Sequence, residues 1–291
     1  MRSLEELLEV HHSNSRQPIQ NVGACGGYLN LQKANILPEE LEAAFNIISN
    51  YPQIRRLGLS HNPSLGPAGA EQLANVLRKV ILGEAKFGEG HDNTVEEEKV
   101  HQLRELFLSE CGFRAEGLSQ LAEALIVSQA EKIGLNQNEL GDAGCFHMRN
   151  ILDTSRLRNL QVLGLIQNGI GDEGALVIAE ALSNNIGLKR LYLNDNVIGD
   201  DGAVALSVAL STHRCLERLG VTFNCIRDGG SLALFAVVSR LATVSSRKFE
   251  KLCIFGNPFS EEARLQLMEC SVVFATKKTR TRIAQHQKVP L

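Results

Sequence analysis

The sequence predicts an α/β solenoid, in which about eight strand-turn-helix units stack into an arc with a parallel sheet on the concave face and helices on the convex face. Residues 188–210, LKRLYLNDNVIGDDGAVALSVAL, first alternate apolar and polar side chains, as a strand does, and then repeat apolar side chains every third or fourth position, as a helix does. The same change of period recurs along the chain, mostly every 27 to 30 residues. One unit cannot bury its own apolar face, so the units must stack.

The repeat is clearest in three consecutive blocks. The central block has its apolar and turn positions at Leu188, Leu191, Leu193, Asn196, Ile198, Gly202, Leu206 and Leu210. Equivalent blocks start at Leu160 and Leu216, weaker copies start at Ile54, Leu103, Ala130 and Phe249, and a degenerate first copy surrounds Leu29 and Leu31. Because packed helices lie about 8–10 Å apart and paired strands about 4.8 Å apart, the sheet must form the shorter, concave side.

Each position of the unit has a physical role. Leu191 and Leu193 point to the same side of a strand. Asn196 follows three residues later, where a buried amide can satisfy the backbone groups of the tight turn. Asp200 stands at a helix start and complements the helix dipole there. Gly202 is expected to leave room where the helix and the strand approach closely.

This pattern, LxxLxLxxNxIGDxGAxxLxxAL at about 28 residues per unit, resembles the ribonuclease-inhibitor-type leucine-rich repeat over roughly residues 26–270. That class also includes Ran GTPase-activating proteins and the sensor arms of NOD-like receptors. The resemblance implies a right-handed α/β horseshoe. It says less about function, because this fold is a platform for many binding roles.

Composition excludes several other classes of protein. The 291 residues carry a net charge near −3, which is typical of neither a nucleic-acid binder nor a strongly acidic chaperone. No apolar run is long enough to span a membrane, and the acidic N-terminus does not resemble a signal peptide, so we expect a cytoplasmic protein. Seven widely spaced cysteines without a C-x-x-C pair predict neither a disulfide framework nor a zinc site. We therefore expect no metal and no cofactor.

We expect one domain, residues 1–291. It divides into an N-terminal cap with a degenerate first repeat at 1–50, a repeat at 54–77, an acidic insertion at 82–102, repeats at 103–270, and a C-terminal cap end with a basic tail at 271–291. The insertion has two readings: a solvated disordered segment, or a functional one that folds onto Arg56 and Lys132 and competes with a partner. The tail likewise has two readings: a solvated end, or a basic peptide for an acidic partner or for nuclear import.

The concave face is the expected binding surface. In each unit one residue directly precedes the pair of strand leucines, as Arg190 precedes Leu191. Five of these eight residues are basic, which predicts a positive band along the edge where strands begin. Between the two leucines, four glycines are expected to expose backbone, interrupted by aromatic side chains that could anchor a protein partner. The candidate partner-binding residues are Arg56, Phe107, Lys132, Ile166, Arg190, Tyr192, Arg218, Lys251 and Phe255. The alternative is that the cations only keep the strand face soluble.

The sequence therefore predicts a non-enzymatic intracellular interaction module, or scaffold, that binds a protein partner with an acidic surface. No catalytic residues, membrane insertion or specific nucleic-acid binding are expected. The alternative is a GTPase-activating protein of the Ran-regulator type, whose partner is a small GTPase. The basic tail differs from the acidic tail typical of that family, and the basic concave band differs from the acidic surface of ribonuclease inhibitors.

Overall fold

A computed structural model describes residues 27–42, 48, 53–82, 103–153, 157, 159–243 and 249–266. The first 26 residues of the expected N-terminal cap, residues 83–102 of the acidic insertion and the basic tail lie outside the described residues. Residue 82, where the insertion was expected to begin, is still helical.

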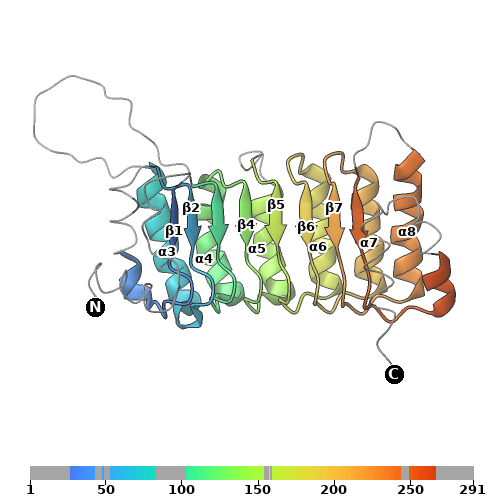
Figure 1. Cartoon of the computed structure of the whole chain (residues 1–291), viewed down its shortest axis with the longest axis horizontal. Helices are drawn as coiled ribbons and strands as arrows, with labels where there is room; N and C mark the ends of the chain where they lie inside the picture. Colours follow the sequence, from blue (N-terminus) through green and yellow to red (C-terminus); the bar gives the residue numbers. More distant parts are fainter. Residues whose placement is uncertain are drawn as a thin grey trace, which may run out of the picture.

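Eight three-residue strands form one parallel sheet, in which each strand pairs with the strand of the next unit (Figure 1). The strands are β1 (Tyr28–Asn30), β2 (Arg56–Gly58), β3 (Glu105–Phe107), β4 (Lys132–Gly134), β5 (Val162–Gly164), β6 (Arg190–Tyr192), β7 (Arg218–Gly220) and β8 (Lys251–Cys253). The register aligns Leu163, Leu191 and Leu219 on neighbouring strands, as the repeat predicts.

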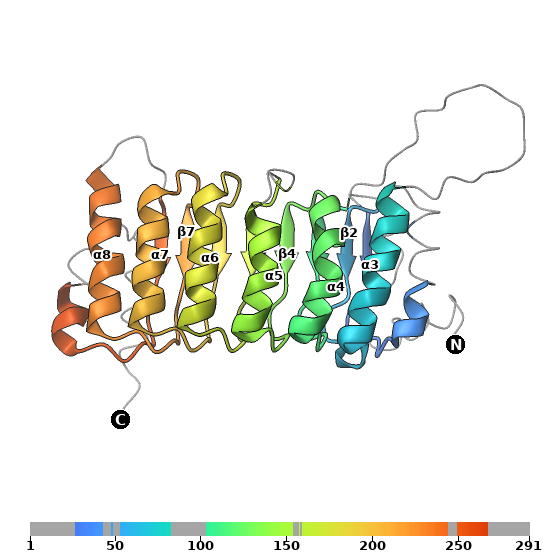
Figure 2. The same ribbon diagram turned by 180° about the vertical axis from the view of Figure 1, so that it is seen from behind.

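The helices all cover one face of this sheet (Figure 2). In the described residues they are α3 (Gly66–Leu82), α4 (Arg114–Val127), α5 (Gly141–Asp153), α6 (Asp172–Asn184), α7 (Asp200–Thr212) and α8 (Asp228–Thr243), with short 3-10 turns η2 (Pro38–Glu40) and η3 (Pro63–Leu65). Because these helices lie on the same side, no helix of the described residues covers the other face, which we call the open face. The sheet does not close on itself, and the predicted solenoid is confirmed.

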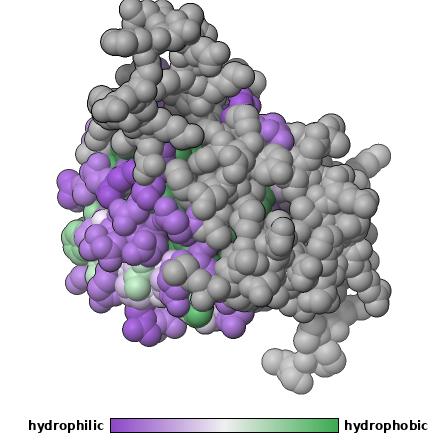
Figure 3. Space-filling view, turned by 90° about the vertical axis from the view of Figure 1, so that its left-hand side faces the viewer, coloured by the Kyte–Doolittle hydropathy of each residue, from purple (hydrophilic) through white to green (hydrophobic). Residues whose placement is uncertain are grey.

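The core is a continuous layer between sheet and helices. Leu191 and Leu193 are fully buried, and Leu206 of α7 packs in the same cluster. Seen from the N-terminal end, the described outer surface is largely hydrophilic, with only small hydrophobic patches (Figure 3). Most apolar residues of the repeat are therefore buried between the sheet and the helices, where they pack neighbouring units together.

The repeating asparagines are buried and bond to turn backbone, as predicted, and they also link successive turns into a ladder, which was not predicted. In the sixth unit, Asn196 Oδ1 accepts the N–H groups of Asn168 (2.9 Å) and Ile170 (3.1 Å) in the preceding turn. Its Nδ2 donates to the carbonyl oxygens of Leu165 and Leu193, each at 3.0 Å. Each amide thus satisfies backbone groups of two units at once.

A second ladder joins the helix starts, and it extends beyond the dipole role expected for the aspartates. Asp172, the first residue of α6, accepts the N–H groups of Gly199 (2.7 Å) and Gly202 (2.8 Å) at the start of α7. Asp200 in turn accepts two N–H groups at the start of α8. Each carboxylate therefore caps the helix of the following unit, in addition to standing in the first turn of its own.

The glycine prediction needs correction. A Cβ on Gly202 would lie 2.7 Å from Asp172 Oδ1, 2.8 Å from Ile198 Cγ2 and 2.9 Å from Ala175 Cβ. Those atoms belong to the preceding helix and to the turn before α7, not to a strand. Glycine here allows close helix-to-helix approach and admits the aspartate cap.

Candidate functional site

The strand register gathers the predicted residues on the open face of the sheet. One column runs Tyr28, Arg56, Glu105, Lys132, Val162, Arg190, Arg218 and Lys251, and the next runs Asn30, Gly58, Phe107, Gly134, Gly164, Tyr192, Gly220 and Cys253. Ile166 and Phe255 follow β5 and β8 two residues beyond the second column. All nine candidates thus lie along one face, spread over strands β2 to β8.

At the N-terminal end of this face, the side chains bind one another. The Tyr28 ring stacks beneath the Arg56 guanidinium, 5.0 Å from the ring centroid, and meets the Phe107 ring edge-on at 6.1 Å. Gln32 Nε2 donates to the Tyr28 hydroxyl at 2.5 Å. We define these four residues as the tyrosine cluster. Burial raises the pKa of Tyr28, so the ring stays neutral and apolar.

Of the four glycines in the second column, Gly134 is half-buried, and the other three do not expose backbone as expected. Gly58, Gly164 and Gly220 are buried. A Cβ on Gly164 would lie 2.8 Å from Asn136 Oδ1, and one on Gly220 would lie 2.7 Å from Asn194 Oδ1. These asparagine side chains cross from the preceding unit to accept the N–H groups of Ile166 (2.9 Å) and Thr222 (3.0 Å). The glycines therefore make room for amide bridges between strands.

The edge where strands begin carries acids among its cations. Lys132 pairs with Glu105 at 2.5 Å, and Arg218 donates two hydrogen bonds to Glu250 at 2.9 and 3.0 Å. The bond to Glu250 is the main cause of the raised pKa of Arg218. The predicted positive band is thus partly neutralised from within.

Arg190 and Lys251 differ from Lys132 and Arg218, because across the described ranges neither has a carboxylate within ion-pair distance. Arg56 also lacks such a carboxylate there, but its guanidinium lies over the Tyr28 ring. Lys251 is exposed and Arg190 is half-buried on the open face. These two side chains retain their charge for a ligand.

One exposed aromatic residue near this face, Phe223, is not among the residues predicted from the sequence. It leads the turn after β7, with 62% of its surface exposed, and its N–H donates to the Phe255 carbonyl oxygen at 2.9 Å. Phe255 is 49% exposed. One feature of the sequence could have identified Phe223. It is apolar at the position before the ladder asparagine, where other units have polar residues: His61, Glu110, Gln137, Gln167 and Asp195.

That position has a left-handed backbone in every unit from the second to the eighth. The φ values run from 52° at Phe223 to 79° at Gly256. Polar residues that tolerate this conformation are common there, whereas a bulky apolar residue is unusual. Phe223 is thus both strained and exposed, a combination that favours a functional role.

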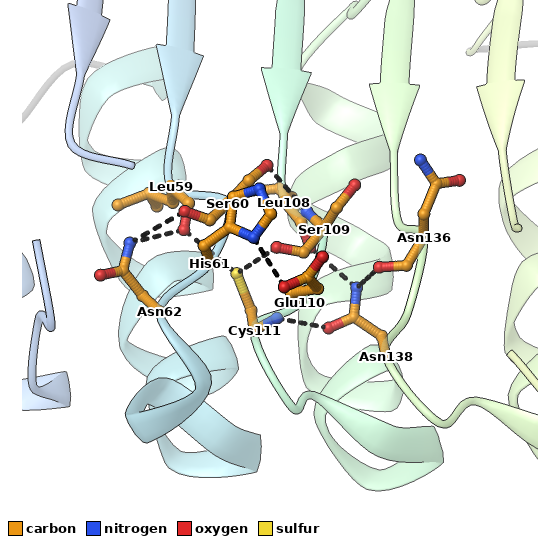
Figure 4. A network of polar contacts seen from close by, with 10 residues as sticks. All are labelled: Leu59, Ser60, His61, Asn62, Leu108, Ser109, Glu110, Cys111, Asn136 and Asn138. Atoms are coloured by element: carbon orange, nitrogen blue, oxygen red, sulfur yellow. Dashed lines mark hydrogen bonds and ion pairs between the residues drawn. The ribbon is translucent and has the colours of Figure 1, made fainter. Parts of the chain in front are cut away.

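The junction of the second and third units departs from the ladder (Figure 4). Cys111 replaces the asparagine, and its thiol contacts the Leu59 carbonyl oxygen at 3.3 Å. Beside it, His61 Nδ1 lies 2.6 Å from Glu110 Oε2, and Ser60 Oγ accepts the Ser109 N–H at 3.1 Å. Burial raises the pKa of Cys111 to about 12, so this thiol is not a nucleophile at neutral pH.

The described residues show neither a metal cluster nor a membrane span. No group of three or more His, Cys, Asp or Glu side chains among them could hold a metal ion. None of the described helices combines the length and apolar character that crossing a bilayer requires.

Comparisons with known proteins agree with the repeat. A family model described as Leucine Rich repeat matches residues 156–179 and 184–207. A Ran GTPase-activating protein of Drosophila melanogaster is 32% identical over 144 residues, which cover 46% of this chain and 21% of that protein. This chain therefore spans about a fifth of the relative's length.

Two solved structures share only a weak likeness to the chain. The match to a TDR receptor covers 76% of this chain and 30% of the receptor chain, with 16% sequence identity and a TM-score of 0.32. The match to a TLR13–ssRNA13 complex covers 76% of this chain and 31% of the matched chain, with 14% sequence identity and a TM-score of 0.31. The matched repeats, the Drosophila relative and the strand-turn-helix geometry together support a leucine-rich-repeat protein of the ribonuclease-inhibitor-like type.

Proposed function

We propose that this chain is a non-enzymatic interaction module that binds a protein partner on the open face of its sheet. One observation carries the proposal: the strand register sets cations and apolar anchors side by side across one uncovered face. Exposed apolar side chains ringed by polar groups are typical of protein-binding surfaces. An acidic partner would be attracted by Arg190 and Lys251.

The proposal places the protein inside the cell, in the cytoplasm or the nucleus. Cys215 and Cys225 are free thiols on the surface, and Cys111 and Cys145 are free thiols in the core. Unpaired surface thiols fit a reducing compartment better than an oxidising one.

The test is a charge reversal at the two unpaired cations. The double variant Arg190→Glu, Lys251→Glu is expected to lose the protein partners that the wild type retains in an affinity pull-down, because the attraction becomes repulsion. Arg149→Glu, Arg240→Glu is the matched control, since it reverses two exposed cations on helices α5 and α8. Partners retained equally by wild type and both variants would show that binding does not use this face.

GTPase activation is the second candidate, supported by the Drosophila relative's identity as a Ran GTPase-activating protein. Phosphate release from GTP-loaded small GTPases, measured with and without this protein, tests it. Under the interaction-module proposal, the rate is expected to stay at its intrinsic value. Activators of this kind accelerate hydrolysis by orders of magnitude, so even a hundredfold increase would overturn the non-enzymatic assignment.

A further inference from the structure

The two halves of the open face are not equally available to a partner. In the N-terminal half, the tyrosine cluster satisfies its own aromatic and polar groups, and Lys132 is paired with Glu105. A ligand there would have to displace these contacts before making its own. The N-terminal half is therefore a poor first contact.

The C-terminal half presents uncommitted groups. Phe223 and Phe255, which we call the phenylalanine pair, are 62% and 49% exposed at the edge where strands end. A Cβ on Gly256 would lie 2.6 Å from Phe223 Cε1, so the Phe223 ring lies against bare backbone there. The exposed phenyl groups of these two adjacent units supply apolar surface at this edge.

Charge stands at the opposite edge of the same strands. Lys251 precedes Phe255 by four residues, which places the start of β8 about 13 Å from the phenylalanine pair at about 3.3 Å per residue. On β6 to β8 and the residues just before them, the cations Lys189, Arg190, Arg218 and Lys251 face the acids Glu217 and Glu250, an excess of two positive charges. This half of the face therefore pairs an apolar edge with a positive edge.

Between the two edges lies the second column of β6 to β8, which holds Tyr192, Gly220 and Cys253. Tyr192 pairs in register with Gly164 on one side and Gly220 on the other, so no large side chain flanks it within its column. A chain crossing β6 to β8 could contact Tyr192, the phenylalanine pair and the unpaired cations together.

We propose that the partner docks on strands β6 to β8 through an acidic segment that carries apolar side chains. Its apolar side chains would pack on the phenylalanine pair, and its carboxylates would meet Arg190 and Lys251. Complementary charge and the apolar surface of the phenylalanine pair together define this occupant. The inference rests on the proposed function and narrows it to one half of the face and one partner chemistry.

The discriminating variant is Phe223→Gln. Glutamine occupies the equivalent position at Gln137 and Gln167 with φ 55°, so the variant keeps the local backbone while removing the exposed ring. The matched control is Phe146→Ala, which removes a phenyl ring that is 54% exposed on α5. Phe107→Ala probes the tyrosine cluster, where neighbouring strands carry Gly58 and Gly134 at the same position. All three variants are expected to remain folded, which circular dichroism and thermal unfolding would check.

The probe is a set of 12-residue peptides selected from a random phage library on the full chain. Selected peptides are expected to combine Asp or Glu with apolar residues, and their Kd, measured by fluorescence anisotropy, should rise about tenfold or more with Phe223→Gln. The same peptides should bind Phe146→Ala as they bind wild type. Reversal of Arg190 and Lys251 should weaken them further at low salt.

The other outcomes separate the two proposals. Peptides that lose affinity with Phe107→Ala but not with Phe223→Gln would overturn this inference and leave the interaction-module proposal standing. Peptides insensitive to every open-face variant would contradict both. A chain that sediments as a dimer and becomes monomeric with Phe223→Gln would show that a second copy occupies the site, which also overturns the inference.

Discussion

Replacing Asn196 by alanine is expected to lower the free energy of unfolding by about 3 kcal/mol or more. The side chain is 6% exposed and accepts two N–H groups of the preceding turn. Alanine would leave the Asn168 and Ile170 amides buried without an acceptor, at about 1–3 kcal/mol each. Carbonyl oxygens that lose the Nδ2 donor add to this cost. Urea unfolding followed by circular dichroism measures it.

The loss should begin at one junction of the stack. Because each unit contacts only its neighbours, weakening the bridge between the fifth and sixth units should open the chain there first. Hydrogen exchange should show lost protection at the Asn168 and Ile170 amides before it spreads. Asn150→Ala, at an exposed site on α5, is the control and should stay within about 0.5 kcal/mol of wild type. Equal stability of the Asn196 and Asn150 variants would contradict the ladder's role.

The sequence predicts the buried asparagines, because each recurs at a constant distance from two strand leucines, but it does not predict their bonds to the preceding unit. A strand alternates its faces, so Leu191 and Leu193 must be buried together and Arg190 and Tyr192 must face away. Stacking identical units then aligns equivalent residues in columns. The fold and the membership of the open face follow from periodicity alone.

Other features depend on side-chain reach, which periodicity does not encode. Asp172 caps the helix of the next unit instead of only its own, because the two helix starts approach closely at Gly202. Gly58 is buried because the Tyr28 hydroxyl and Gln32 fold over it from the preceding strand. The aspartate cap recurs from Asp142 to Asp228, but the leucine period does not show which helix each carboxylate reaches. The contact over Gly58 belongs to the first two units, so no consensus pattern indicates it.

The sequence predicts that the five cations share one column, but it does not predict which of them are paired with acids. Periodicity placed the five cations in one column, yet pairing depends on which acid stands on the adjacent strand. Glu105 neighbours Lys132, and Glu250 lies beside Arg218, whereas Arg190 has no such neighbour in the described structure. Phe223 was missed because the leucine pattern shows neither the left-handed backbone at this position nor the exposure of its ring.

Replacing Gly202 by valine is the second change expected to have a large effect. A Cβ there would fall 2.7 Å from Asp172 Oδ1 and 2.9 Å from Ala175 Cβ. Separations below 3.0 Å require α7 to move away from α6, and overpacking of this kind costs about 1–3 kcal/mol. The same movement would break the Gly202 N–H bond to Asp172, at about 1 kcal/mol or more.

A graded series makes this prediction sharp. Gly202→Ala should destabilise the chain less than Gly202→Val, because two further methyl groups must be accommodated. Gly229→Ala is the matched control at the start of α8, where a Cβ would lie 3.4 Å from Asp200 Oδ2, an ordinary contact. It should be neutral or stabilising, since alanine favours a helix more than glycine does. If thermal unfolding showed the Gly202 variants to be as stable as Gly229→Ala, α6 and α7 would not pack as closely as Figure 2 and the Cβ distances indicate. The close approach proposed for the Asp172 cap would then be wrong.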